Sequence, residues 1–360
     1  MSMTVQTIAQ SLGVECAGDK DLVIDRASEP AAAGPRDLAL AMDKSYLDAL
    51  AAGAAEAAVL WQGADWQALG LKAAIFVSRP RFAMAGITAV FDRAPVIDAG
   101  IHATAVIHPT AVIGEGAAIG PFVVIGPNAS IGARARLLSH VTISEDAVIG
   151  DDALIYSGVR IGSRVVIGDR FIAHFNSVVG SDGFSFVTLE PNAAEEARSS
   201  FEASGTAKPQ SYHRIASTAS VKVGDDVELG ASSTLDKGTV ADTVIGDGTK
   251  IDNHVQVGHN VRIGRDCLLC AHAAVAGSSV LGDRVILGGQ AGVGDHLVLG
   301  DDVIAAGATA ILSNVPAGRV MMGYPAMPMK QNIAAYKALR RLPRLVVKIN
   351  DLQKLVLKPK

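Results

Sequence analysis

Residues 101–120 read IHATAVIHPTAVIGEGAAIG, and an aliphatic residue stands at every sixth position from Ile101 onward. The spacing continues without a break to Ile167, and a second series runs from Ile245 to Ile311. Between them, residues 223, 229 and 235 keep the period in a shifted frame. A period of six residues matches neither the 3.6-residue period of a helix nor the alternation of a long strand. The repeat predicts a parallel β-helix in which three hexapeptides form one triangular coil of 18 residues, with aliphatic side chains inside and small residues at the corners.

The composition supports this interpretation and limits the function. The chain is 49% hydrophobic, which excludes disorder, but only 4% aromatic with 37 glycines, so we expect an interior with room for methyl groups and not for rings. A net charge of −4 gives no support for nucleic-acid binding. Three cysteines favour a reducing compartment. Without a signal-peptide pattern or an apolar run of 18 residues, we expect a cytoplasmic protein with no integral membrane segment.

The period divides the chain into three parts. Residues 1–98 lack it and combine an amphipathic helix at 5–12 with buried strands at 57–60 and 73–77, as in a small α/β domain. Residues 99–318 form the β-helix, from which a polar loop at about 181–214 departs. Residues 319–360 are predicted to be a helical extension that Pro343 divides into two helices.

A dry aliphatic interior leaves chemistry to the outer faces, where histidines are the groups that titrate near neutral pH. Counting by 18 places His254 and His272 in one column, followed by Gln290. His296 falls in the column of Asn260, and His259 falls in the neighbouring one. We expect His259 and His296 to line one groove, roughly 10 Å apart.

His259 is the candidate general base, although most outward histidines are simply solvated. Asp252, one turn earlier, is the candidate carboxylate that orients the imidazole, and Gly258 leaves room for a ligand. Other chemistries are weaker. His254 and His259 could be two zinc ligands, as in gamma-class carbonic anhydrases, but a third histidine has no obvious place. A single CxxC at 267–270 favours packed thiols, and no G-x-S-x-G nucleophile motif occurs.

Three segments carry a resemblance to a known family: residues 251–260, IDNHVQVGHN, residues 180–184, GSDGF, and residues 288–290, GGQ. The chain resembles LpxD, the UDP-3-O-(3-hydroxyacyl)glucosamine N-acyltransferases of lipid A biosynthesis, over nearly its whole length. The resemblance implies a left-handed parallel β-helix with an N-terminal uridine-binding domain at 1–98. It also implies transfer of a 3-hydroxyacyl chain from acyl carrier protein to the 2-amine of a UDP-glucosamine.

The resemblance also implies roles for particular residues. His259 matches the catalytic base, Asp252 the carboxylate that orients it, and His296 a second functional histidine that assists the acyl donor or the oxyanion. The implied substrate-binding residues are Leu40, Asp43, Tyr46, Asn253, Gln256, Gly258, Asn260 and Gly289. Tyr46 matches an aromatic near the uracil, whereas Leu40 and Asp43 replace the usual phenylalanine and asparagine. No metal and no permanently bound cofactor are implied, because the donor itself carries 4′-phosphopantetheine.

Two partners are predicted besides the UDP-sugar. Outward aliphatic residues would leave a single prism with apolar faces in water, so we expect a homotrimer with sites in the grooves between subunits. Basic residues in the tail, among them Arg340, Arg341 and Arg344, predict a docking surface for the acidic acyl carrier protein, although a solvated helix face is the alternative. Two other functions remain open: a coenzyme A-dependent hexapeptide acyltransferase and a non-enzymatic solenoid that binds partners.

Overall fold

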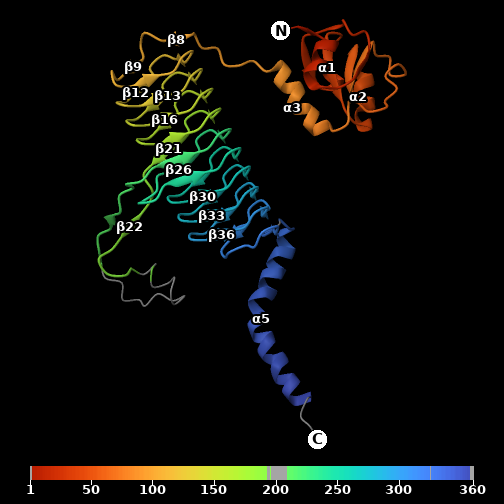
Figure 1. Ribbon diagram of the computed structural model, residues 1–360. Helices are drawn as coiled ribbons and strands as arrows, with labels where there is room; N and C mark the ends of the chain where they lie inside the picture. The colour runs from red at the N-terminus through yellow and green to blue at the C-terminus, as the bar shows by residue number, and fades with distance from the viewer. Residues whose placement is uncertain (1, 193–194, 196–208, 325, 357–360) are drawn as a thin grey trace. The chain divides into compact units, whose positions relative to one another are not determined.

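The computed structural model describes residues 2–192, 195, 209–324 and 326–356. Its contacts divide the chain into two compact units, Met1–Val96 and Ile97–Lys360. Figure 1 shows the first unit as a small domain of helices and strands and the second as a long stack of coils with a C-terminal helix.

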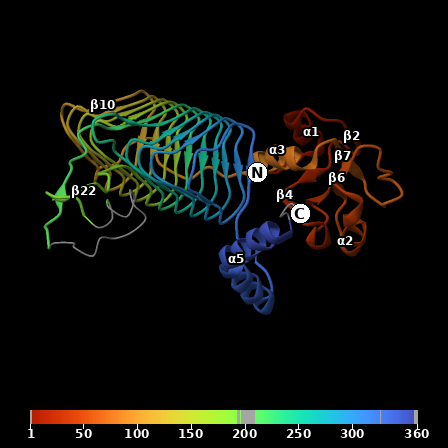
Figure 2. The ribbon, with the colours of Figure 1, turned by 90° about the horizontal axis from the view of Figure 1, so that it is seen from below.

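The stack is a parallel β-helix, as the six-residue period predicted, and it is left-handed, as the family resemblance implied. Its three sheets hold nine, eleven and ten strands, and nearly every strand is two residues long. The sheets begin at β8 (Gly100–Ile101), β9 (Val106–Ile107) and β10 (Val112–Ile113), and end at β39 (Val320–Met321), β38 (Ala310–Ile311) and β36 (Val298–Leu299). Residues 18 apart pair directly, as Ile113 does with Ile131, so one coil lies on the next (Figure 2).

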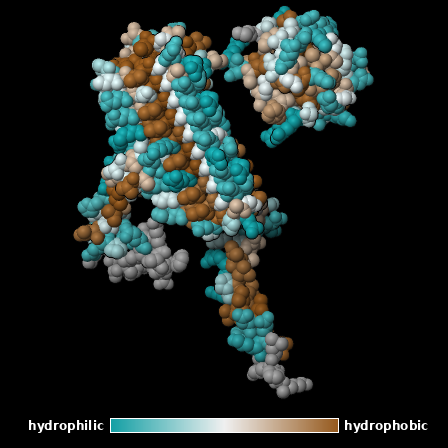
Figure 3. Space-filling model, viewed as in Figure 1, coloured by the Kyte–Doolittle hydropathy of each residue, from teal (hydrophilic) through white to brown (hydrophobic). Residues whose placement is uncertain are grey.

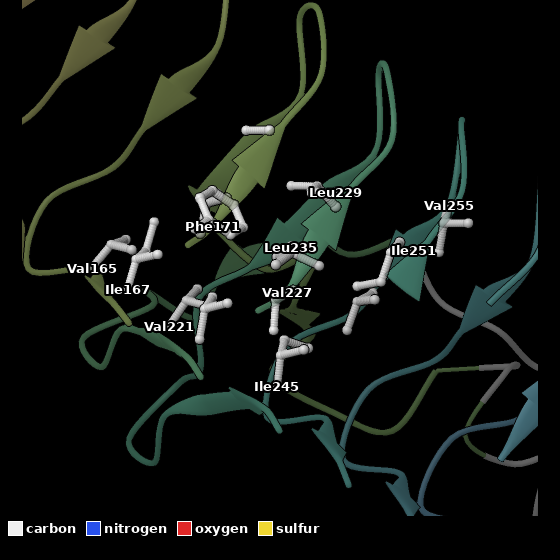
Figure 4. Close-up of a cluster of buried hydrophobic side chains, with 14 of the residues drawn as sticks. Val165, Ile167, Phe171, Val221, Val227, Leu229, Leu235, Ile245, Ile251 and Val255 are labelled. Carbon is white, nitrogen blue, oxygen red and sulfur yellow. The ribbon is translucent and has the colours of Figure 1, made fainter. Parts of the chain in front are cut away.

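The interior of the solenoid consists of the aliphatic residues at every sixth position and their small or β-branched neighbours. Figure 4 shows such side chains pointing into the prism from several coils. Phe171, which is fully buried among them, contradicts the expectation of an interior without rings. Its ring fits because Ala153, one coil earlier, and Ala173, in the same coil, are both small.

The middle of the solenoid departs from the repeat twice. Between β21 (Val178–Ser181) and β24 (Val221–Val223) the chain leaves the prism, and β22 (Phe186–Val187) pairs antiparallel with β23 (His213–Arg214). The polar loop predicted at about 181–214, including its segment 185–213, to which we assign no function, lies partly outside the described residues. Farther on, Val223 pairs with Ile245, 22 residues away instead of 18, so this coil has four extra residues. They lie at the corner between β26 (Thr234–Asp236) and β27 (Thr243–Ile245), which explains the shifted frame.

Two of the three corner columns differ in chemistry. We call the column of Arg134, Asp152, Arg170, Asp226, Arg284 and Asp302 the charged edge. Along it each arginine forms a two-point ion pair with the aspartate of the next coil. The column of Asn128, Asp146, Arg164, Asn260, Ser278 and His296 is the His259 edge, because His259 precedes Asn260.

The N-terminal unit has a five-stranded sheet in the order β2-β7-β6-β5-β4, parallel except for β2 (Cys16–Gly18). The other strands are β4 (Arg26–Ser28), β5 (Asp37–Ala41), β6 (Ala57–Trp61) and β7 (Ala73–Val77). The helices are α1 (Val5–Leu12), α2 (Leu47–Ala52) and α3 (Pro80–Phe91). The predicted helix and both predicted strands are confirmed. Thr4 begins α1 as its N-cap, and Gly13 ends it at a φ of 64°.

The C-terminal helix α5 (Met329–Val356) contains Pro343 and is continuous, so the expected division into two helices is wrong. Proline removes one backbone donor, but the side chains of α5 that are described are exposed. Freed carbonyl groups on an exposed helix can bond to water, which makes the interruption tolerable. Within the described residues, no helix is long and apolar enough to cross a bilayer.

Candidate functional site

A groove of about 700 Å³ lies on the outer face of the sheet that contains β26, β29 (Gln256–Val257), β32 (Ala274–Val275), β35 (Gly292–Val293) and β38. Its polar end is lined by Asp182, Asp236, Gln256 and His259. Its other end is lined by small and apolar residues, among them Ala274, Gly292 and Leu312.

The change along the groove follows from the outward residue of each successive strand. Thr234 pairs with Gln256, Gln256 with Ala274, Ala274 with Gly292, and Gly292 with Ala310. A Cβ atom added to Gly292 would meet nothing within 4 Å, so the groove is open there. The groove therefore changes along the stack from polar groups at one end to small and apolar groups at the other.

His259 lies at the polar end, between two glycines. A Cβ atom on Gly183 would lie 2.6 Å from the Cβ of His259, and one on Gly277 would lie 2.8 Å from its Nε2. Gly183 belongs to the excursion after β21, where its N–H donates to Ser217 Oγ at 2.9 Å. The imidazole thus fits into a slot that any larger residue at 183 or 277 would fill.

Asn260 fixes the tautomer of this imidazole. Its Nδ2 donates to the Ala241 carbonyl at 2.8 Å, and its Oδ1 accepts from the Thr239 N–H at 3.1 Å. Because a carbonyl only accepts and an N–H only donates, these two contacts determine the orientation of the amide. Oδ1 then lies 3.0 Å from His259 Nδ1, which must carry the proton. The neutral imidazole is left with its lone pair on Nε2, beside Gly277.

The prediction that Asp252 orients His259 is wrong within this chain. Its two carboxylate oxygens accept from the backbone N–H groups of Asn253 and Ala271 at another corner of the prism. Asn253 in turn accepts from the Ala231 N–H, and Gly289 lies beside Ala271 at that same corner. Sequence spacing suggested that a carboxylate orients His259. The structure shows that the side-chain amide of the next residue, Asn260, makes this contact instead. The sequence analysis predicts a substrate-binding role for Asn260.

Asp252 instead lines a separate cavity of about 530 Å³ with His174, Phe175 and Glu228. His174 Nε2 lies 2.8 Å from Glu228 Oε1. Gln256 and Gly258, by contrast, do line the groove of His259, as their predicted role requires. The structure therefore separates the predicted residues into two sets on two faces of the same prism.

A larger hollow of about 940 Å³ adjoins the groove on the side of the excursion. His259 and His296 both line it, together with Phe184, Phe186 and Tyr212 of the excursion. The expectation that the two histidines share a groove is met in this geometry, although the side chain of His296 is exposed. Gly277, which lies between them, has an N–H that donates to no other group in the described part of the chain.

Asp236 is a functional candidate that the sequence analysis missed. The residue is 6% exposed, and its Oδ2 accepts from Gln256 Nε2 at 2.8 Å. Burial raises the pKa of this carboxyl to about 6, while the Gln256 hydrogen bond and the attraction of His259 act in the opposite direction. The next two coils carry Gly258 and Ala276 at the same position, so the carboxyl of Asp236 departs from the small residues that follow it in this column.

The histidines do not meet as metal ligands. His254 lies at a different corner from His259 and stacks on His272, with ring centroids 5.0 Å apart and planes 8° apart. No group of three or more histidine, cysteine or acidic side chains in the described residues is arranged to hold a metal ion. Cys267 is buried, which raises the pKa of its thiol, and is therefore a packed residue.

Comparisons with known proteins agree with this geometry. The bacterial transferase hexapeptide model (six repeats) matches residues 242–277, and that of the GMPPB C-terminal domain matches residues 101–184. The UDP-3-O-acylglucosamine N-acyltransferase of Ruegeria pomeroyi is 59% identical over 76% of both chains. That of Paracoccus denitrificans is 58% identical over 77% of this chain and 76% of its own. The chain belongs to the UDP-3-O-acylglucosamine N-acyltransferase family.

A solved structure supports the fold alone. The Arabidopsis UDP-N-acetylglucosamine acyltransferase is 22% identical and aligns with a TM-score of 0.53, covering 62% of this chain and 71% of that one. Family membership, shown by the two relatives, confirms the resemblance stated from the sequence.

In this member of the N-acyltransferase family, the three residues predicted near the uracil follow one another at the end of β5. Leu40 is half-buried, and Tyr46 is 45% exposed. The Asp43 carboxylate accepts from the Ser45 N–H and hydroxyl, and the hydroxyl contact is the main reason that its pKa is lowered. Asp43 thus caps the turn that holds Tyr46, and its uridine contact stays a prediction.

The predicted docking residues Arg340, Arg341 and Arg344 are all exposed on α5. The Arg340 guanidinium lies 6.0 Å from the ring centre of Tyr336 on the same helix. Apolar residues of α5, including Leu339, are exposed as well, and Figure 3 shows them as a brown band along the helix.

Proposed function

We propose that the protein transfers a 3-hydroxyacyl group from the thioester of acyl carrier protein to the 2-amine of UDP-3-O-acylglucosamine, a step of lipid A biosynthesis. One observation carries the proposal. Asn260 Oδ1 lies 3.0 Å from His259 Nδ1, so the neutral imidazole has its lone pair on Nε2, at the polar end of an apolar groove. That arrangement supplies a general base for an amine and a dry surface for an acyl chain.

The chemistry follows from these groups. The amine nitrogen attacks the thioester carbonyl, forms the N–C bond, and gives a proton to His259 Nε2. The C–S bond then breaks and the carrier thiol leaves with that proton. The N–H of Gly277, which donates to no group in the part of the chain that the structure describes, stabilises the oxyanion of the tetrahedral intermediate, and His296 assists across the adjoining hollow. A thioester is already activated, so the residues here form no covalent intermediate, and no permanently bound cofactor is proposed.

We further propose that the protein is a homotrimer in the cytoplasm. Outward valines on the sheet of β10 to β36 are unusually exposed for apolar residues: Val112, Val148, Val166 and Val298. Parallel packing of three prisms would cover such faces and close the open grooves into channels. The uridine group is assigned to Tyr46 and its neighbours in the N-terminal unit.

The test is a mass-spectrometric assay of the purified protein with UDP-3-O-acylglucosamine and a panel of 3-hydroxyacyl carrier proteins. We expect an added 3-hydroxyacyl amide on the sugar, and none with His259→Ala. Turnover with acetyl-coenzyme A and indifference to the carrier protein would instead favour the alternative coenzyme A-dependent acyltransferase. Sedimentation at micromolar concentration tests the trimer, which a monomeric mass would exclude.

A further inference from the structure

Asp236 is a buried acid at the reacting end of the groove that the proposed steps leave unused. Asp236 pairs with Ser181 in the preceding coil, and the next two coils carry Gly258 and Ala276, with little or no side chain, at the same position. Room for the carboxyl comes from the preceding coil, where the pairing of β21 with β26 shifts by one residue between Val179 and Ser181. Gly180, at the shift, has a φ of 92° that suits glycine.

The hydrogen bonding of Asp236 is incomplete. Oδ2 accepts from Gln256, whereas Oδ1 has no hydrogen bond to any described residue. Both Asp236 and Gln256 line the groove beside His259. A carboxylate has about four acceptor positions, so a buried one with a single neutral donor is poorly satisfied by the protein.

The cations near Asp236 are already engaged. Lys237, next in the chain, donates from Nζ to Ser163 Oγ at 3.0 Å. Arg214 forms an ion pair with Asp182, the other acid of the groove. In the described residues Asp236 has no ion pair, and the charged groups that act on it most are His259, which attracts it, and Asp182, which repels it.

We propose that Asp236 selects an amine as the acyl acceptor, by accepting a hydrogen bond from the acceptor's amino group while His259 faces the same nitrogen. An amino group would complete the hydrogen bonding of this carboxyl, because it supplies N–H donors and gains positive charge during the reaction. As the nitrogen attacks the thioester carbon it gains positive charge, and Asp236 stabilises that charge until the proton passes to His259 Nε2. A hydroxyl acceptor offers one donor and little charge, so it gains much less. This inference rests on the proposed function and adds its selectivity for nitrogen over oxygen.

The test compares two acceptors in wild type and Asp236→Asn. One is UDP-3-O-acylglucosamine, and the other is the analogue with a hydroxyl in place of the 2-amine, used as a competitive inhibitor. We expect Asp236→Asn to weaken kcat/KM for the amine by about tenfold to a hundredfold, the range for a hydrogen bond to a charged group. The inhibition constant of the hydroxyl analogue should change less than threefold.

Asp236→Glu, which keeps the charge, should recover part of the amine preference. It replaces Asp236→Asn as the test variant if Asp236→Asn does not fold. Asp283→Asn is the matched control, since this aspartate lies next to the charged edge and should leave both acceptors unaffected. The inference is overturned if Asp236→Asn weakens both acceptors equally, or neither. A wild-type protein that does not acylate the UDP-sugar at all would overturn the proposed function instead, so the two failures are distinct.

Discussion

The charged edge and the His259 edge belong to the same prism, yet they are built in opposite ways. Along the charged edge the same contact recurs at three places in the described residues, including the pairs Arg134–Asp152 and Arg284–Asp302, both 18 residues apart. At the His259 edge, the contacts that position His259 and Asn260 come from segments that interrupt the 18-residue repeat. The excursion supplies Gly183, and the 22-residue coil supplies Thr239. Repetition holds the stack together, and its interruptions form the site.

The largest effect expected from this comparison is at His259. His259→Ala should lower kcat by about 10²- to 10⁴-fold, the usual contribution of a general base. Its imidazole lies in a surface groove and not in the core, so the melting temperature should stay within a few degrees of wild type. Activity within threefold of wild type would mean that another residue is the base.

Asn260→Ala should have the second-largest effect on activity. It should lower kcat by about tenfold to a hundredfold, since the imidazole loses the acceptor that fixes its tautomer. Asn260→Asp keeps an acceptor but adds a negative charge beside the imidazole, which favours its protonated form. The acid limb of the pH–rate profile should then move to higher pH. Thr239→Val is the matched control, because the Thr239 N–H and the Ala241 carbonyl still hold the amide. An unshifted profile in Asn260→Asp would show that Asn260 does not contact the base during turnover.

The same contrast explains what the sequence could predict. Three features were predictable because each depends on local or periodic rules. They are the regular coils, the column that His254 and His272 share, and helix α1. Asp252 does not reach His259 of its own chain, because seven residues along a six-residue repeat place the two at different corners, which the assignment from sequence did not take into account. Asp236 and Thr239 were missed because they matter only after the shifted frame is placed in space. The shift itself was visible, and it was the signal that could have directed attention to residues 234–241.

The charged edge should affect stability and not catalysis. Hydrogen bonds from the paired arginines lower the pKa of Asp152, Asp226 and Asp302. Carboxylates whose folded pKa is depressed stabilise the protein above their unfolded pKa of about 3.9, and that contribution is lost as pH falls through the folded values. The triple variant to asparagine should melt a few degrees lower at pH 7 and show a flatter dependence below about pH 4, with kcat unchanged. A changed kcat would mean that the two edges are coupled.

The tail belongs to neither edge, and we expect it to affect binding of the carrier protein and not turnover. Charge reversal at Arg340, Arg341 and Arg344 should raise KM for the acyl carrier protein by roughly tenfold at low salt, because exposed charges act mainly on association. The KM for the UDP-sugar should hardly change, since none of the proposed uridine residues belongs to α5. The defect should shrink as ionic strength rises and screens these exposed groups. Lys354→Glu is the matched control on the same helix, where Lys354 already lies 3.8 Å from Asp351. Equal effects on both substrates, or on neither, would assign the arginines to a solvated helix face.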